Sequence, residues 1–202
     1  MISPRLTLAL TGGIASGKSA ALELLKRAEP GLHAFDCDLE VRQLLGRPEV
    51  QRHIADALGQ ALILPGGGLD RDRLRSEVFG DPAKRKLLEG ILHPLVRQEC
   101  LARHAEWSKS EGSSLFVADV PLLFKNDFSF PYDASVTVAV SRETQMERVR
   151  RRNGFDDKHI EQILAAQLDT GEKMRRADHV LWNEGPLEGL AAQITLLIKT
   201  LR

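Results

Sequence analysis

Residues 12–19, close to the N-terminus, have the types and spacing needed to hold a chain of phosphates. They match the pattern Gly-x-x-x-x-Gly-Lys-Ser, in which backbone N–H groups of a tight loop point at phosphate oxygens. Glycine allows the unusual dihedral angles and the close backbone approach that such a loop requires. The pattern therefore predicts a P-loop that binds a nucleoside triphosphate.

The residues of this loop have separable expected roles. Lys18 should reach the β- and γ-phosphates, and the Ser19 hydroxyl should ligate Mg²⁺. The helix that begins here turns its positive N-terminal end toward the anion. The residues expected to bind the nucleotide are Gly12, Gly13, Ile14, Ala15, Ser16, Gly17, Lys18, Ser19 and Ala20.

Two acids stand at the end of a second predicted strand, about twenty residues after the loop. In open α/β sheets ligands gather at the carboxyl ends of strands, so Asp36 and Asp38 should face the same crevice as the phosphates. A carboxylate there can orient and deprotonate an attacking hydroxyl, and Asp38 is the favoured general base. Either acid could instead cap the helix that starts near Leu39, and for Asp36 the two interpretations are evenly balanced.

A third acid, Asp119, follows the apolar residues 115–118. Many P-loop proteins place such a strand-end aspartate on Mg²⁺, so Asp119 is a candidate metal ligand with Ser19. The alternative is a turn residue ahead of Pro121.

A helix predicted from about residue 142 carries four closely spaced arginines, namely Arg148, Arg150, Arg151 and Arg152. Arg148 and Arg152 lie four residues apart and therefore share a face. If Asn153-Gly154 is a hinge, this helix and the next, over 157–168, could close as a lid and bring both arginines to the transferring phosphoryl group. A basic helix face that is only solvated is the alternative.

Charge and hydropathy limit the classes of partner. Lys plus Arg and Asp plus Glu both number 28, so no basic field favours nucleic acid or an anionic membrane. The chain has neither an apolar run long enough to span a membrane nor a signal-peptide pattern. We expect a cytoplasmic protein without a nucleic-acid or membrane partner, and the oligomeric state stays open. Cys37 and Cys100 have no CxxC spacing and are expected to be reduced and partly buried.

Short apolar strands alternate with longer helical segments, which predicts an α/β fold with a parallel sheet of about five strands flanked by helices. The expected strands cover 6–11, 33–36, 115–119, 135–140 and 179–182. Helices are expected over 20–28, 39–45, 49–58, 71–79, 83–92 and 95–110, the last two separated by Pro94. We expect one domain with a core over about 1–38, 113–141 and 177–202, a helical acceptor-binding segment over 39–112 and a lid over 142–176.

Several motifs along the chain together resemble the dephospho-coenzyme A kinase family. They are Thr11 to Ser19, Asp36-Cys37-Asp38, Leu69-Asp70-Arg71 with Val78-Phe79, His93-Pro94-Leu95-Val96, Val120 to Phe124, Gln162 to Gln167, and Ala177-Asp178 followed by Asn183. Each piece alone is weak, but their order and spacing are specific and cover nearly the whole chain.

The resemblance implies transfer of the ATP γ-phosphate to the ribose 3′-hydroxyl of dephospho-coenzyme A, the last step of coenzyme A synthesis, with ATP and Mg²⁺. It implies that Asp38 is the catalytic aspartate, assisted by Lys18 and by the lid arginines Arg148 and Arg152. The residues expected to bind the acceptor are Asp36, Arg71, His93 and Arg97. His-Pro could also be an ordinary helix stop, and the two arginines could be surface residues.

Three residues depart from the usual family pattern. Ala15 occupies a position that is commonly glycine, which is tolerable if its φ is below zero. Cys37 stands where a small alanine is usual and fits sterically. Lys125 replaces an acid, which puts in doubt any role for an acid there.

Two alternative functions are open. Another small-molecule or nucleoside kinase on the same core would differ in its acceptor. A non-enzymatic nucleotide switch would need guanine-selecting motifs such as Asn-Lys-x-Asp, and the order Lys125-Asn126-Asp127 does not supply one.

Overall fold

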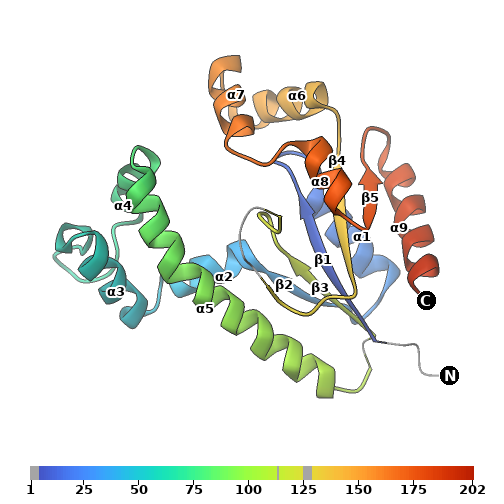
Figure 1. The fold of residues 1–202 in the computed structure, drawn as a ribbon, viewed down its shortest axis with the longest axis horizontal. Helices are drawn as coiled ribbons and strands as arrows, with labels where there is room; N and C mark the ends of the chain where they lie inside the picture. The colour runs from blue at the N-terminus through green and yellow to red at the C-terminus, as the bar shows by residue number, and fades with distance from the viewer. Residues whose placement is uncertain (1–4, 113, 125–128) are drawn as a thin grey trace. The chain divides into compact units, whose positions relative to one another are not determined.

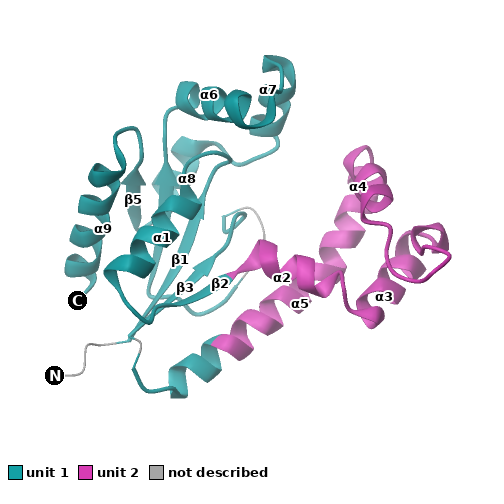
Figure 2. Ribbon diagram, turned by 180° about the vertical axis from the view of Figure 1, so that it is seen from behind, with its two compact units in different colours: residues 1–35, 104–202 teal, residues 36–103 magenta. Residues whose placement is uncertain are grey.

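The computed structural model describes residues 5–112, 114–124 and 129–202. Lys125, one of the family departures, lies outside these residues, as do Asn126 and Asp127. Two compact units make up the chain: residues 1–35 with 104–202, and residues 36–103 (Figure 2). Within the described residues, no helix combines the length and apolar character needed to cross a membrane.

The described part of the chain combines five strands with helices, and a run of helices separates the second strand from the third, as the sequence pattern predicts (Figure 1). In order they are β1 (Leu6–Gly12), α1 (Lys18–Ala28), β2 (His33–Asp36), α2 (Cys37–Leu44), α3 (Pro48–Leu58), the 3-10 helix η1 (Gln60–Leu62), α4 (Arg71–Phe79), α5 (Pro82–Lys109), β3 (Leu115–Asp119), β4 (Ala134–Ala139), α6 (Arg142–Asn153), α7 (Asp157–Ala165), α8 (Thr170–Arg176), β5 (His179–Trp182) and α9 (Leu187–Leu201).

The strands form one five-stranded sheet in the order β2-β3-β1-β4-β5, with β1 at its centre. β1 runs parallel to β3 and β4, and β4 runs parallel to β5. Leu10 of β1 is in register with Asp119 of β3, so the ends of these strands lie side by side. The predicted parallel sheet flanked by helices is confirmed.

One face of the sheet is covered by α1 and α9, which pack against each other. Because successive residues of a strand point to opposite faces, Leu8 and Leu10 of β1 face these helices together. Leu25 of α1 and Ile194 of α9 are fully buried against them. Burying each such side chain contributes roughly 2 kcal/mol, so this layer holds the strand ends in place.

The opposite face carries an aromatic cluster around His104, in the last part of α5. The His104 ring lies edge-on to Phe116 of β3, with 5.1 Å between ring centroids, and also contacts Trp107. Its Nε2 atom is 2.9 Å from the Thr7 hydroxyl of β1. Burial lowers the pKa of His104, because the charged imidazolium would lose its hydration there.

The second unit comprises α2, α3, η1, α4 and most of α5. Its centre includes Glu40, whose side chain is only 2 % exposed. Arg103 donates to one Glu40 oxygen at 2.8 Å, and Arg47 binds both Glu40, at 3.5 Å, and Glu99, at 2.7 Å. A buried carboxylate is strongly destabilising unless it is paired, so these two arginines are needed to keep α2 against α5.

Pro94 does not end a helix, and the prediction of two helices over 83–92 and 95–110 is wrong. α5 runs from Pro82 to Lys109 with Pro94 inside it. Proline removes one backbone hydrogen bond, the one to the carbonyl of Gly90, while the turns on either side keep theirs. Leu92 and Val96, on either side of Pro94, are buried, so packing offsets the lost bond.

Candidate active site

The two glycines that frame the phosphate loop occupy places that no other residue fits. A Cβ atom on Gly12 would lie 2.9 Å from the carbonyl oxygen of Val138, and one on Gly17 would lie 2.0 Å from Nδ2 of Asn183. Gly17 also has a φ of 93°, in the left-handed region that side chains disfavour. No side chain caps the N-terminus of α1, which begins at Lys18, so the first N–H groups of this helix are available to an anion.

Ala15 has a φ of 57°, so the condition under which alanine fits this position without strain, a φ below zero, is not met. An L-residue in the left-handed region costs roughly 1 kcal/mol, because its Cβ crowds the backbone carbonyl. The loop therefore keeps the conformation that glycine would adopt freely and carries this strain at residue 15.

Lys18 and Asp119 form an ion pair. Both are largely buried, with 16 % and 6 % of their side chains exposed. The register of β3 beside β1 places Asp119 next to the start of the loop. The structure thus joins two residues for which the sequence predicts separate roles, one on phosphate and one on Mg²⁺.

The two predicted lid arginines differ in their surroundings. Arg148 is half-buried, and its guanidinium donates to the carbonyl oxygens of Ala15, at 3.3 Å, and Asn183, at 3.0 Å. Arg152 is exposed, and no hydrogen bond or ion pair involves it within the described part of the chain. The structure therefore brings Arg148 to the loop but not Arg152. The predicted helix over 157–168 is shorter, since α7 ends at Ala165.

Two glutamines for which the sequence predicts no role at the site bind the loop at Ile14. The Ile14 N–H donates to Oε1 of Gln167 at 3.1 Å, and Nε2 of Gln145 donates to the Ile14 carbonyl at 3.0 Å. Gln145 is itself held by the Thr170 hydroxyl at 3.4 Å. Gln167 ends one of the motifs that resemble the family, but a glutamine in a polar helical segment does not by itself indicate contact with the loop.

A buried lysine, Lys173 of α8, also lies beside the loop. Its side chain is among the buried polar groups, at 5 % exposed, and its Nζ atom lies 3.6 Å from where a Cβ on Gly13 would be. A small pocket is lined by Thr11, Pro121, Leu122, Phe124, Leu168 and Lys173. Sequence reasoning missed this cation because Lys173 stands in a charged helix next to arginines that are exposed.

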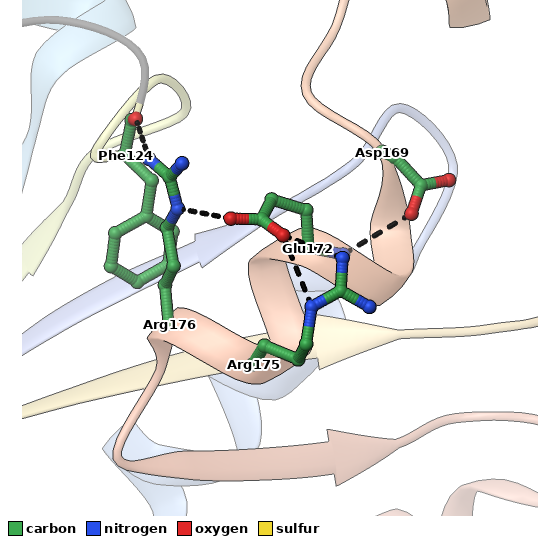
Figure 3. Close-up of polar contacts among 5 residues, drawn as sticks. All are labelled: Phe124, Asp169, Glu172, Arg175 and Arg176. Atoms are coloured by element: carbon green, nitrogen blue, oxygen red, sulfur yellow. Dashed lines mark hydrogen bonds and ion pairs between the residues drawn. The ribbon is translucent and has the colours of Figure 1, made fainter.

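Helix α8 is fixed by a network around Glu172 (Figure 3). Arg175 and Arg176 both bind the Glu172 carboxylate and lower the pKa of that carboxyl. Arg176 also donates to the carbonyl oxygen of Phe124 at 3.0 Å, and the Asp169 side chain caps the helix by accepting from the Glu172 N–H at 3.1 Å. These contacts tie α8 to the segment after β3, which orients Lys173 toward the loop.

The remaining candidates belong to the second unit. Asp36 caps α2, because its Oδ1 accepts from the Leu39 N–H at 2.9 Å, whereas Asp38 is exposed in the first turn of the same helix. Arg71 donates to the carbonyl of Arg42 at 3.2 Å. His93 and Arg97 lie four residues apart on α5 and so share a helix face.

A parallel sheet with a phosphate loop at the end of its central strand, followed by a helix whose N-terminus no side chain caps, defines a P-loop nucleotide-binding protein. Residues 6–188 match the model of the dephospho-CoA kinase family. The chain belongs to this family and is an ATP-dependent kinase of coenzyme A biosynthesis.

Individual relatives agree with this assignment. The chain is 40 % identical over 189 residues to a dephospho-CoA kinase of Symbiobacterium thermophilum, covering 93 % of this chain and 77 % of that protein. It is 37 % identical over 196 residues to one of Geobacillus kaustophilus, covering 96 % of each. Among solved structures, TT1252 from Thermus thermophilus is 29 % identical, with a TM-score of 0.79 and coverage of 99 % of this chain and 100 % of that one.

Proposed function

We propose that this protein transfers the γ-phosphate of ATP to the ribose 3′-hydroxyl of dephospho-coenzyme A, giving coenzyme A and ADP, and that the residues below carry the reaction. The observation that carries the proposal is the phosphate loop, whose glycines have no room for side chains and whose following helix has a free N-terminus. In this class of reaction the protein contributes positioning and charge neutralisation.

Lys18 is proposed to change partner when ATP binds. Its ammonium pairs with Asp119 in the structure, and a triphosphate on the loop offers oxygens that carry more negative charge than this one carboxylate. Lys18 would then bind the β- and γ-phosphates, and Asp119 would turn to the metal. The buried ammonium of Lys173, beside Gly13, adds a second positive charge near the same phosphates.

Mg²⁺ is proposed to be held by the Ser19 hydroxyl and the Asp119 carboxylate together with ATP. Within the described residues no group of three or more His, Cys, Asp or Glu side chains could hold a metal. Mg²⁺ is usually bound through one or two protein oxygens, substrate phosphates and water, so one hydroxyl and one carboxylate from the protein suffice. When bound, the ion neutralises charge that develops on the phosphoryl oxygens.

Asp38 is proposed as the general base that orients and deprotonates the ribose hydroxyl. Its carboxylate is exposed, whereas that of Asp36 is engaged in capping α2. Arg71 and Arg97 of the second unit are proposed to bind the acceptor's phosphates, and Asp36 and His93 are proposed as further acceptor-binding residues. Arg152, exposed on α6, is the lid arginine proposed to approach the transferring phosphoryl group.

Product analysis tests the function. The purified protein, supplied with ATP, Mg²⁺ and dephospho-coenzyme A, should form coenzyme A and ADP in equal amounts. A panel of nucleosides and sugars should give little product. Turnover of another acceptor in preference would assign a different small-molecule kinase, and ATP binding without any transfer would leave a nucleotide switch. We also propose that the enzyme is cytoplasmic and that its partner is a small molecule, since the balanced charge of the chain gives no basic field that would favour nucleic acid.

A further inference from the structure

Three consecutive carbonyl oxygens of the phosphate loop each accept a hydrogen bond from a side chain. The Ile14 carbonyl accepts from Nε2 of Gln145 at 3.0 Å, and the Ala15 carbonyl accepts from the guanidinium of Arg148 at 3.3 Å. The Ser16 carbonyl accepts from Nδ2 of Asn183 at 2.9 Å. The three donors come from two places in the chain, α6 and the turn after β5.

This arrangement follows from the geometry of a peptide. Its N–H and C=O point in opposite directions, so a loop that turns its N–H groups inward to a phosphate must turn carbonyls outward. The outward carbonyls of this loop face protein rather than water, because Gln145 and Asn183 are buried at 5 % and 8 % exposed. A buried carbonyl without a donor is costly, so these side chains fix the orientation of their three peptides and favour inward N–H groups at Ala15 and Gly17, while the Ser16 N–H donates to the Gly13 carbonyl at 3.2 Å.

The donors are themselves fixed in place. Gln145 and Arg148 are three residues apart on α6 and therefore share a face of that helix. Asn183 is anchored by its own backbone, since its N–H donates to the Ala139 carbonyl at 2.8 Å and its carbonyl accepts from Arg148 at 3.0 Å. The side-chain oxygen of Gln145 accepts from Thr170, which leaves its nitrogen pointing at Ile14.

We propose that Gln145, Arg148 and Asn183 are positioning residues that hold the phosphate loop in its binding geometry before the nucleotide arrives. We name these three side chains the carbonyl collar. The inference rests on the proposed binding of ATP phosphates to this loop. Arg148 is then not a side chain that contacts the transferring phosphoryl group, as the sequence predicts, but one that acts through the loop backbone.

The collar is tested by replacing an amide with an apolar side chain of similar length, Gln145→Met and Asn183→Leu. Each variant leaves one outward carbonyl without a donor and adds no charge. We expect the Kd for ATP and the inhibition constant of tripolyphosphate, an acceptor-independent probe of the loop, to rise about fivefold or more. The kcat at saturating ATP should change much less. The lost interaction stabilises the bound ground state and the transition state equally, so the barrier between them stays the same.

Gln193→Met is the matched control. Gln193 of α9 also binds backbone, donating to the Trp182 carbonyl at 2.8 Å and accepting from the Trp182 N–H at 2.9 Å, but it does not contact the loop. This variant should keep wild-type Kd values even if its melting temperature falls. All assays are run well below the melting temperature of each variant.

Each outcome decides the question. Wild-type affinity for ATP and tripolyphosphate in Gln145→Met and Asn183→Leu would overturn the collar, and so would an equal loss of affinity in Gln193→Met. The two substitutions lie on separate elements, so one of them carries the test if the other variant does not fold. Failure of the wild-type protein to bind ATP would instead overturn the proposed function.

Discussion

At the scale of single residues, the phosphate loop shows how little freedom its positions have. Gly12 and Gly17 have no space for a Cβ atom, which is why the motif has glycine at these two positions. Ala15 is different, because it has a Cβ and still adopts a φ of 57°. Its neighbours must therefore impose this conformation, and the hydrogen bond from Arg148 to the Ala15 carbonyl is one such constraint.

Replacing Ala15 with glycine should stabilise the protein. Glycine removes roughly 1 to 2 kcal/mol of left-handed strain and gives back part of this through the greater entropy of its unfolded chain. We expect the free energy of unfolding to rise by roughly 0.5 kcal/mol, measured by urea denaturation. Ala105→Gly, on an exposed position within α5, should instead lower it by about 1 kcal/mol. Equal destabilisation by both changes would contradict strain at Ala15.

The Asp38→Asn variant should lose turnover while keeping ATP affinity. The amide occupies the same space but cannot accept the proton of the ribose hydroxyl, so kcat should fall about 10²-fold or more. Steady-state rates and a direct measurement of ATP binding separate the two effects. Asp36→Asn serves as the comparison, because asparagine caps a helix about as well as aspartate, so kcat and stability should both change little. An unchanged kcat in Asp38→Asn would place the base elsewhere.

At the scale of elements, the position of a helix and the spacing of residues along it decide which side chains lie beside the phosphate loop. α6 brings Gln145 and Arg148 to the loop from one face, while Arg152, one turn further, remains exposed. α8 delivers Lys173 because Glu172 and Arg176 anchor the helix to the segment after β3. In both helices the residue spacing follows from the helix itself, but the residues that these side chains contact are far away in the sequence.

Replacing Pro94 should make α5 more stable. Pro94 is exposed in the interior of this helix and leaves the carbonyl of Gly90 without its intrahelical donor. Pro94→Ala restores the donor, so we expect the free energy of unfolding to rise by about 1 kcal/mol or more. The KM for dephospho-coenzyme A, measured in parallel, reports whether the proline serves the acceptor instead. A lower free energy of unfolding in Pro94→Ala would contradict this, because it would show that packing of the proline ring stabilises α5 by more than the missing hydrogen bond costs.

At the scale of the whole molecule, the chain folds as two compact units. In the first unit, a carboxylate links two strands that are far apart in the sequence. Asp178, just before β5, accepts from both the N–H and the hydroxyl of Ser135 in β4, at 2.8 and 2.6 Å. These bonds, the hydroxyl bond foremost, lower the pKa of Asp178. The helical segment predicted over 39–112 overlaps the second unit at 36–103, and its role in binding the acceptor stays a prediction.

Acidification should weaken the fold through Asp178. A carboxyl whose pKa is lower in the folded than in the unfolded state stabilises the fold above its unfolded pKa of about 3.9. That contribution is lost as the pH falls through the folded pKa. The wild-type protein should therefore lose more stability between about pH 5 and pH 2.5 than Asp178→Asn does. Urea midpoints at several pH values measure the difference, and parallel curves for the two proteins would contradict a role for this carboxyl.

Local sequence determined much of this protein. The bounds of β2, β3, β5 and α4 match the predicted ranges, because apolar alternation, proline and glycine act within a few residues. The phosphate loop was evident for the same reason, since a continuous stretch of backbone builds it. Family membership, too, could be inferred from the order of short motifs and is confirmed by the match over residues 6–188.

Only the tertiary structure decided which distant side chains meet. Lys18 and Asp119 are 101 positions apart, and the pair forms because β1 and β3 are neighbours in the sheet. Asn183 reaches the Ser16 carbonyl across 167 positions, a contact that no local pattern encodes. Gln145 and Lys173 look like ordinary surface residues of polar helices, and they become part of the site because packing buries them against the loop. Pairing and burial depend on the whole chain, so these roles follow from the fold and not from the spacing of residues.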